Sequence, residues 1–262
     1  MTEREYRQHP AISRSELWHI RKSPAHFKEE KDNPSPPTPS LLLGQLTHAF
    51  LLTPDEVENQ FAVLPDINRR TREGKAIYSE WIEENTEKVI VPAQMWEQAR
   101  SIAGAVLDVP KARKLLQGLK EVPYFWKHPI TEEECKCRVD CLNTSLSRPT
   151  IVEYKTAADA SLEAFVRAAI KYGYDFQSGM YSQGVEQNIG EEPMFVFIVA
   201  ETSPPYAVNI LCADETFVAH GKDIMAELME IYHDCKLTGN WWGYLGKDNQ
   251  INTLTLPPWV QI

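Results

Sequence analysis

Two acidic residues and a lysine stand on consecutive apolar runs of this 262-residue chain. Asp140 lies in the run Arg138-Val-Asp-Cys-Leu, and Glu153 and Lys155 lie in the run that begins at Ile151. Both runs have the composition of strands, and a Pro-containing turn separates them. If residues 144–149 connect a hairpin, Asp140 falls opposite Glu153, with the two Cβ atoms about 5 Å apart.

The alternation of side chains along a strand then sorts this hairpin into two faces. One face is expected to carry Cys137, Val139, Cys141, Val152 and Tyr154. The other is expected to carry Arg138, Asp140, Glu153 and Lys155. Two carboxylates and an ammonium group therefore converge on one face.

Two carboxylates this close repel each other unless a cation lies between them. Mg²⁺ is the fitting ion, because it binds one or two carboxylates together with water and substrate phosphate. Lys155 is in position to orient or deprotonate the attacking water, or to stabilise charge on the phosphate. The chemistry indicated is phosphodiester hydrolysis. The alternative is an ordinary surface pair of acid and lysine, because this spacing alone is a loose motif.

Length and charge limit the classes of protein. The chain is long enough for one large domain, and we expect a single domain over residues 1–262. An N-terminal apolar run and a bilayer-length apolar stretch are both absent from the sequence, which predicts a soluble, cytoplasmic protein. The net charge of −10 argues against a protein that coats nucleic acid, but permits an enzyme with one local basic groove.

The five cysteines are an odd number in a domain of ordinary size, which does not indicate a disulfide framework. Cys135, Cys137 and Cys141 could also be read as zinc or iron–sulfur ligands. The spaced second pair that structural metal sites use is missing, so reduced cysteines are the preferred interpretation.

The first part of the chain reads as mainly helical, over residues 1–118. Ser13 and Glu16 form a capping-box pattern that predicts a helix to about Lys22, and prolines make residues 32–40 a loop. Residues 41–52 predict a buried helix on which Gly44 and His48 share a face. His48 by itself is more typical of a core histidine than of a ligand. Further predicted elements are helices over 76–84, 92–106 and 110–119 and a strand over 89–91.

The second part, residues 119–262, reads as a sheet with helices. Strands are predicted over 122–126, 134–142, 150–155, 194–200 and 206–211. Helices are predicted over 161–170, 175–187 and from a cap at Asp214 to about residue 236, followed by an irregular tail. The fold class expected is α/β, with a mixed central sheet flanked by helices.

A basic cluster stands out in this acidic chain, consisting of Arg69, Arg70, Arg72 and Lys75. A solvated turn is the usual role of such a charge run. It is also the best local candidate for holding DNA phosphate.

Several runs together resemble a known family. They are Leu43-Gly44-x-x-x-His48, Asn68-Arg-Arg-Thr71-x-x-Gly74-Lys75, Glu121 with Tyr124 to Trp126, Cys135-x-Cys137-Arg138-x-Asp140, Glu153-x-Lys155-Thr156-x-Ala158-Asp159, Gln177-x-x-x-Tyr181-Ser182, Phe195-Val-Phe-x-Val-Ala200 and Thr253-Leu-x-Leu-Pro-x-Trp259. In this order they resemble the PD-(D/E)xK nuclease superfamily, whose core is restriction-endonuclease-like. Within it they resemble the nuclease domain of RecE-type exonucleases (exodeoxyribonuclease VIII) and, more distantly, the lambda-type phage exonucleases. Glu153 stands where the close relative has Asp, and Val139 replaces a proline.

The resemblance implies a role for individual residues. The metal ligands it implies are His48, Glu121, Asp140, Glu153 and the backbone carbonyl of Tyr154, around Mg²⁺ for which Mn²⁺ substitutes, with two ions per site. Lys155 matches the catalytic lysine. Gln177 and Tyr181, at helical i and i+4, match a motif that lines the DNA beside the metals.

The resemblance also implies an activity and partners. RecE-like enzymes degrade the 5′-ended strand of linear duplex DNA and leave a 3′ single strand for a RecT-type annealing protein in homologous recombination. Family members form rings around DNA, so a trimer or tetramer in the cytoplasm of a bacterial or phage-infected cell is expected, without a membrane partner. Two alternatives stay open. One is a non-catalytic protein that binds DNA ends or acts as a scaffold, and the other is an endonuclease or a 3′-directed processing enzyme on the same core.

Overall fold

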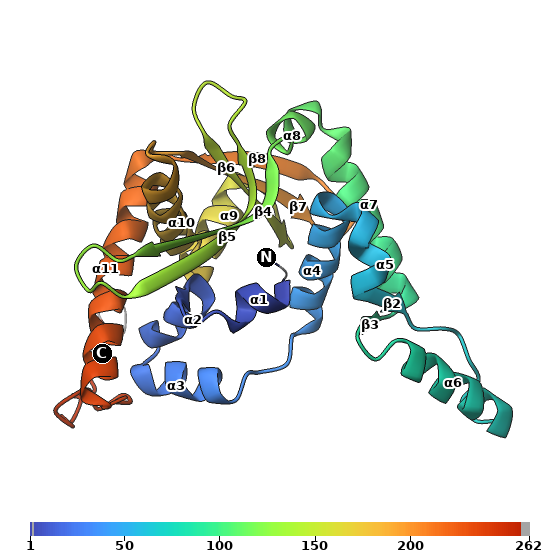
Figure 1. Ribbon diagram of the computed structural model, residues 1–262, viewed down its shortest axis with the longest axis horizontal. Coiled ribbons are helices and arrows are strands. Elements are labelled where there is room, and N and C mark those ends of the chain that lie inside the picture. The colour runs from blue at the N-terminus through green and yellow to red at the C-terminus, as the bar shows by residue number, and fades with distance from the viewer. Residues whose placement is uncertain (2, 258–262) are drawn as a thin grey trace.

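A mixed six-stranded sheet forms the centre of the computed structural model, which describes residue 1 and residues 3–257 (Figure 1). Its strands are β1 (Ile12–Ser13), β4 (Leu119–Lys127), β5 (Glu134–Asn143), β6 (Thr150–Ala157), β7 (Met194–Glu201) and β8 (Val208–Ala213). Strand β6 is parallel to β7 and antiparallel to β5, and β8 is antiparallel to β7. The predicted mixed sheet is confirmed.

Strand β5 pairs with three other strands, and the sheet has a gap along one of the two edges of β5. Along one edge β5 pairs with β4. Along its other edge, β6 pairs only with residues 141–143, whereas β1 pairs with Cys135 and Lys136. Strands β5 and β6 therefore separate before residue 140, in the middle of the sheet.

Helices cover both faces of the sheet. The helices of the described residues are α1 (Glu3–Gln8), α2 (Arg14–Trp18), α3 (Pro24–Asp32), α4 (Pro39–Leu52), α5 (Val57–Gln60), α6 (Arg72–Glu84), α7 (Ala93–Asp108), α8 (Pro110–Leu115), α9 (Leu162–Tyr172), α10 (Tyr174–Ile189) and α11 (Glu215–Thr238), with 3₁₀ turns at His19–Arg21 and Pro54–Glu56. Helices α9, α10 and α11 bury one apolar core against the sheet, and α4, α7 and α8 bury a second. Among the described helices, none combines the length and apolarity that crossing a bilayer requires.

Local signals in the sequence account for most helix ends. The capping box at Ser13 is present, but its helix ends at Trp18 and continues as a 3₁₀ turn. Asp214 caps α11 as predicted, by accepting a hydrogen bond from the backbone N–H of Phe217. Helix α4 begins at Pro39, inside the segment that we predicted to be a loop, because Thr38 caps it.

Three N-terminal elements were not predicted. Ser23 and Pro24, which we read as the end of a helix, begin α3 instead: Ser23 caps it and Pro24 occupies its first turn. Helix α1 and strand β1 are too short for periodicity to reveal. Of the irregular tail that we predicted, Trp259 lies outside the described residues.

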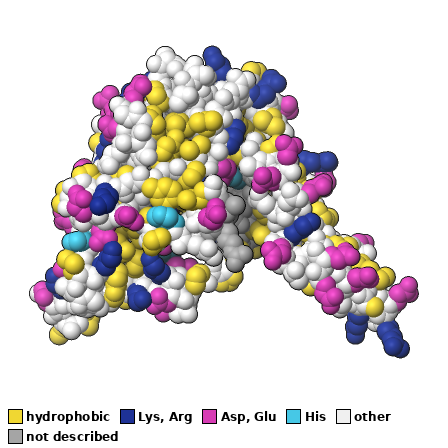
Figure 2. Space-filling view, in the orientation of Figure 1, with side chains coloured by type: hydrophobic (Ala, Val, Ile, Leu, Met, Phe, Trp, Pro, Cys, Tyr) yellow, Lys and Arg dark blue, Asp and Glu magenta, His cyan; other side chains and the backbone are white. Residues whose placement is uncertain are grey.

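An arm projects from the body of the molecule, away from the central sheet (Figure 1). It consists of helix α6 with the parallel two-stranded sheet of β2 (Phe61–Val63) and β3 (Val89–Val91) at its base. Thr71 caps α6, and the basic side chains at its start are exposed to solvent. Figure 2 shows Lys and Arg side chains at the far end of this arm.

Helices α10 and α11 approach each other so closely that glycine is required at Gly221. A Cβ atom there would lie 1.9 Å from the carbonyl oxygen of Asp175. We expect Gly221→Ala to lower the free energy of unfolding by about 3 kcal/mol, since backbone atoms must move apart. Gly104→Ala in α7 is the matched control, because a Cβ there meets no described atom within 4 Å. Urea unfolding should show Gly104→Ala unchanged or more stable by up to about 1 kcal/mol. Equal stability of both variants would contradict this close packing.

Candidate active site

Three carboxylates occupy the same level on three neighbouring strands. In β4 and β5 the paired residues on either side place Glu121 opposite Asp140. In β5 and β6 the register from Asn143–Thr150 to Cys141–Val152 leads next to Asp140 and Glu153, which confirms the predicted alignment. Glu121 lies within β4 rather than before it, and its φ of 53° is in the left-handed region. The regular ladder is thus interrupted at this level.

The carboxylates of Asp140 and Glu153 take over the backbone hydrogen bonds that the ladder loses. The backbone N–H of Asp140 donates to Glu153 Oε1 at 3.1 Å, and the N–H of Tyr154 donates to Asp140 Oδ2 at 2.8 Å. Each strand therefore binds a carboxylate of the other strand. Both acidic residues are buried, Asp140 at 8% exposure and Glu153 at 1%. The gap between β5 and β6 is held open by the two residues that the sequence placed there.

The predicted sorting of the hairpin into two faces is wrong for part of β5. Cys137 and Val139 belong to the core beneath α10 and α11. Cys141, Val152 and Tyr154 belong to the core on the opposite side of the sheet. The strand changes face at Asp140, because the ladder is interrupted there and strict alternation does not continue through an irregular residue.

His48 brings helix α4 to this gap. Its Nε2 atom lies 2.8 Å from Asp140 Oδ1 and 3.3 Å from Glu121 Oε1. Ligand atoms of His48, Glu121 and Asp140 all lie within 4.8 Å of one another. Residues from α4, β4 and β5 therefore form one group, and one imidazole with two carboxylates suits a divalent cation.

Glu153 is held from the other side by residues that follow it in the chain. Lys155 Nζ lies 3.0 Å from Glu153 Oε2, and the Gln177 side-chain amide donates to the same oxygen at 2.6 Å. The ammonium group of Lys155 also lies 5.4 Å from the centre of the Tyr174 ring. Helix α10 thus fixes Glu153 and Lys155 relative to the gap.

Burial changes the proton affinity of two of the carboxylates. It raises the pKa of Glu121 to about 7, and the negative charge of Asp140 adds to this rise. Burial and the charge of Asp140 likewise raise the pKa of Glu153 to about 7. Burial also opposes ionisation of Asp140, but His48 and Lys155 outweigh it and hold the pKa of Asp140 below its ordinary value. Asp140 is thus the most firmly ionised of the three.

The two cationic groups are stabilised by these carboxylates. Burial disfavours the charged form of His48, but Asp140 and Glu121 raise its pKa to about 9. The pKa of Lys155 is raised by Glu153 and Asp140 despite its burial. Metal ligation requires a deprotonated imidazole nitrogen, so a divalent cation that His48 ligates would compete with a proton at Nε2.

The structure does not place every predicted site residue in direct contact with the carboxylates of the gap. Tyr181 is close enough to Glu153 for the carboxylate to raise its pKa, in addition to the larger effect of burial. Tyr154 contributes its backbone N–H, whereas the role of its carbonyl oxygen as a ligand stays a prediction. The cluster of Arg69, Arg70, Arg72 and Lys75 lies on the projecting arm, and DNA binding there also stays a prediction.

Arg138 is a site residue that the sequence analysis did not assign. Its Nε lies 2.8 Å from Glu121 Oε2, whereas His48 contacts the other oxygen of this carboxylate. Its guanidinium carbon lies 5.2 Å from the centre of the Tyr6 ring. Alternation on β5 had placed Arg138 on the face of Asp140, which was the available signal. The Tyr6 contact depends on folding of the N-terminal segment.

Lys136 fastens that N-terminal segment next to the site. Its buried ammonium group donates to the carbonyl oxygens of Tyr6 at 2.9 Å and His9 at 2.7 Å. These are carbonyls at the C-terminal end of α1, where a cation also interacts favourably with the helix dipole. Helix α1 therefore lies beside β5, with Tyr6 against Arg138.

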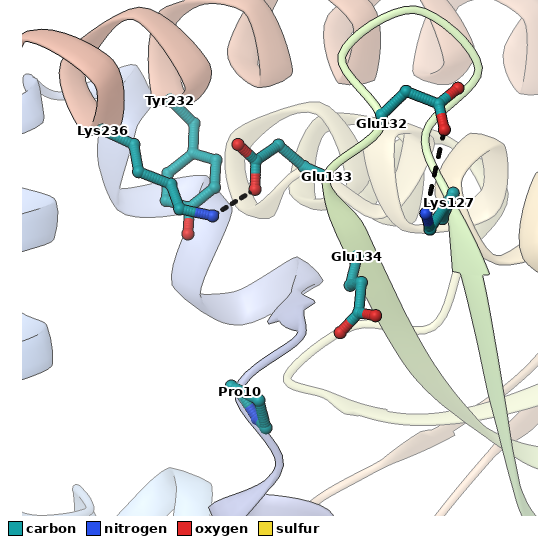
Figure 3. Close-up of a pocket in the computed structure, with 7 residues that line it drawn as sticks. All are labelled: Pro10, Lys127, Glu132, Glu133, Glu134, Tyr232 and Lys236. Atoms are coloured by element: carbon teal, nitrogen blue, oxygen red, sulfur yellow. Dashed lines mark hydrogen bonds and ion pairs between the residues drawn. The ribbon is translucent and has the colours of Figure 1, made fainter.

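A separate hollow of about 280 Å³ lies between the N-terminal segment, the β4–β5 connection and α11 (Figure 3). Two of its three acidic residues are paired with cations: Glu133 contacts Lys236, and Glu132 lies 4.0 Å from Lys127. His233 Nδ1 also lies 2.9 Å from Glu133. The paired charges indicate a structural role, and the hollow does not include the His48 group.

Comparison with known proteins then places the chain in a family. Residues 13–252 match a family described as a PDDEXK-like domain of unknown function, DUF3799. The chain belongs to the DUF3799 family. The nuclease-type superfamily that the sequence suggested is thereby confirmed, whereas the RecE-type assignment within it stays a prediction. No curated protein matches the DUF3799 chain.

Solved structures are similar to this DUF3799 chain at low sequence identity. A crystal structure of a proposed exonuclease from Eubacterium rectale has a TM-score of 0.65 and 14% identity, and the match covers 98% of this chain and 95% of that one. This similarity shows the fold. The structure of SSO0001 has a TM-score of 0.31 and 15% identity over 71% of this chain and 88% of that one. At that score it supports no conclusion.

Proposed function

We propose that this protein is a magnesium-dependent exonuclease that degrades linear double-stranded DNA in the 5′-to-3′ direction. The observation that carries the proposal is the gap between β5 and β6, where Asp140, Glu153 and Lys155 meet beside His48 and Glu121. The PDDEXK-like family supports a nuclease, and the fold shared with a proposed exonuclease is consistent with it. The direction of digestion rests on the RecE-type resemblance.

Different side chains of the site have different roles in phosphodiester hydrolysis. Asp140, Glu121 and His48 would hold Mg²⁺, with Glu153 and the Tyr154 carbonyl oxygen completing the ligands of one or two ions. When bound, the cation supplies Lewis acidity to the phosphate and to the attacking water. Lys155 orients that water or stabilises charge on the phosphate oxygens, and its ion pair with Glu153 keeps it at the gap. Gln177 fixes the carboxylate of Glu153, and Tyr181 lies one helical turn further along α10.

We also propose the partners that the resemblance implies. DNA ends are the substrate, and a RecT-type annealing protein receives the 3′ single strand in recombination. A ring-shaped trimer or tetramer in the cytoplasm would enclose the duplex. Mn²⁺ is expected to replace Mg²⁺.

The decisive experiment uses linear duplex DNA labelled separately at its 5′ and 3′ ends, with Mg²⁺ and with EDTA. Early release of the 5′ label with Mg²⁺ alone is the expected result, and covalently closed duplex should remain intact. Rapid nicking of the closed duplex would favour an endonuclease. Binding of ends without any digestion would favour the non-catalytic alternative.

The basic cluster on the arm allows a test of where DNA phosphate is held. Replacing Arg69, Arg70, Arg72 and Lys75 with Gln should weaken duplex binding and reduce the slope of log K against log salt by about 0.9 for each phosphate that is no longer neutralised. Fluorescence anisotropy at several salt concentrations measures this slope. Arg167→Gln with Lys171→Gln, on exposed positions of α9, is the control. An unchanged slope in the arm variant would make the cluster a solvated turn.

A further inference from the structure

The chain after α11 exposes large apolar side chains. Ile251 is 93% exposed, Leu254 is 99% exposed and Leu256 is 67% exposed. They lie in residues 251–257, which form no helix or strand in this structure and which we name the tail. Single exposed apolar residues are common, but three within six residues of an otherwise polar segment are typical of a surface that a partner covers.

The tail begins at a fixed place on the molecule. The Asn252 side chain donates to the carbonyl oxygen of Tyr244 at 3.0 Å, and the Tyr244 ring lies 5.4 Å from that of His26. Lys247 forms an ion pair at 2.8 Å with Asp234, one turn before the end of α11. The tail therefore starts beside the C-terminal end of α11.

A groove lies at the opposite end of α11. It has a volume of about 460 Å³ between helix α8 and the β5–β6 connection. Strands β7 and β8 contribute Val196, Ile210 and Cys212 to its lining, and the β5–β6 connection contributes Leu146. The basic side chains of Lys111, Lys114 and Arg148 also line it. Strand β8 is at the end of the sheet, and within the described residues it pairs with β7 alone. The groove thus opens along an edge strand.

The tail of one molecule does not reach its own groove. Helix α11 follows β8 directly and has 24 residues, so it separates the two by about 36 Å. Figure 1 shows α8 and the β5–β6 connection at one end of the molecule, and α11 runs from there toward the other end. Leu256 lies four residues beyond Asn252, a separation of at most about 14 Å when the chain is fully extended.

We propose that the tail of one molecule lies in the groove of a second copy, as an added strand along β8. Residues 253–256 alternate Thr with Leu, which suits a strand, and Leu254 and Leu256 then face the same way, onto the aliphatic residues of the groove. Backbone hydrogen bonds from the β8 edge provide affinity in such strand addition. None of the described residues that line the groove is aromatic, so it lacks a surface on which a nucleic-acid base would stack.

The contact joins different surfaces of the two copies and is therefore heterologous. After the first contact, the molecule that gave its tail keeps a free groove and its partner keeps a free tail, so the contact repeats until a ring closes or a filament grows. This assembly does not depend on the proposed nuclease function, and its test measures mass and cross-linking rather than digestion.

A disulfide trap tests the contact directly. Cys212 is exposed in the groove, whereas the other four cysteines are buried. Under mild oxidation, Leu254→Cys or Leu256→Cys should give a ladder of covalent multimers on a non-reducing gel, and Cys212→Ser in the same protein should remove it. Monomer-sized products alone, or no dependence on Cys212, would overturn the proposal.

Light scattering after gel filtration provides the second test. Wild type should have a mass of at least two chains of 30.0 kDa each, and the double variant Leu254→Asp, Leu256→Asp should fall to the single-chain mass. Cys212→Glu should do the same from the groove side. Leu162→Asp is the matched control, since Leu162 is 61% exposed on α9. A monomeric wild type, or dissociation by Leu162→Asp but not by the tail variant, contradicts the proposal. Cys212→Glu that loses duplex binding at unchanged mass would instead assign the groove to nucleic acid.

Discussion

Replacement of Lys155 by alanine is expected to lower magnesium-dependent digestion of linear duplex DNA by at least about a thousandfold. Lys155 holds the only cation that the described structure places in direct contact with Glu153, at 3.0 Å. Its loss removes a positive charge that acts where negative charge develops on the phosphate. Groups that stabilise such charge contribute about 10²–10³ in rate, and the loss is larger when they also orient the attacking water. Initial rates on end-labelled duplex measure the effect.

The Lys155→Ala protein should remain folded. Glu153, with a pKa of about 7, can take up a proton when its ammonium partner is absent, so a buried unpaired charge does not persist. Circular dichroism and thermal unfolding check this point. Lys171→Ala is the matched control, because Lys171 also lies over a tyrosine ring, 5.2 Å from the centre of Tyr172, but on the surface of α9. Full activity in a nuclease-free preparation of Lys155→Ala would remove Lys155 from the active site.

Asp140→Asn should abolish digestion and lower metal affinity by at least about a hundredfold. Asp140 contacts both His48 and the backbone N–H of Tyr154 in the β5–β6 gap. Its charge therefore acts on both strands of the gap and on His48. Asparagine retains an oxygen that accepts the Tyr154 N–H, so the gap itself should survive. Hard divalent cations bind neutral amide oxygens less strongly than carboxylates.

Titration calorimetry with Mn²⁺ and with Mg²⁺ measures the loss of affinity, and digestion assays measure the loss of rate. Asp55→Asn is the control, because Asp55 is exposed in the 3₁₀ turn after α4. Wild type should also gain thermal stability on addition of either ion and lose that gain with EDTA. Unchanged Mn²⁺ affinity in Asp140→Asn would move the metal site away from the gap.

The sequence determined the alignment of Asp140 with Glu153 and the fold class. Strand composition and the length of the connection at residues 144–149 set the register, and the structure has that register. The predicted alternation of side chains between the two faces fails along β5 on the N-terminal side of Asp140. The carboxylates of Asp140 and Glu153 accept hydrogen bonds from the backbone of the opposite strand and end the regular ladder on which this alternation depends. Helix α3 was missed because Ser23 and Pro24 were read as an end, although Ser before Pro is also a signal that begins a helix.

Other features were decided by tertiary structure, because they join segments that are far apart in the chain. The local pattern around His48 is that of a core histidine, and packing of α4 on the sheet brings its Nε2 to Asp140. Arg138 acquires its role from Glu121, and Lys136 from the carbonyls of α1, through contacts that spacing along one strand does not reveal. The residue types that carry the chemistry are thus readable from the sequence. Their mutual distances depend on where the strands separate and on which helices enclose the gap.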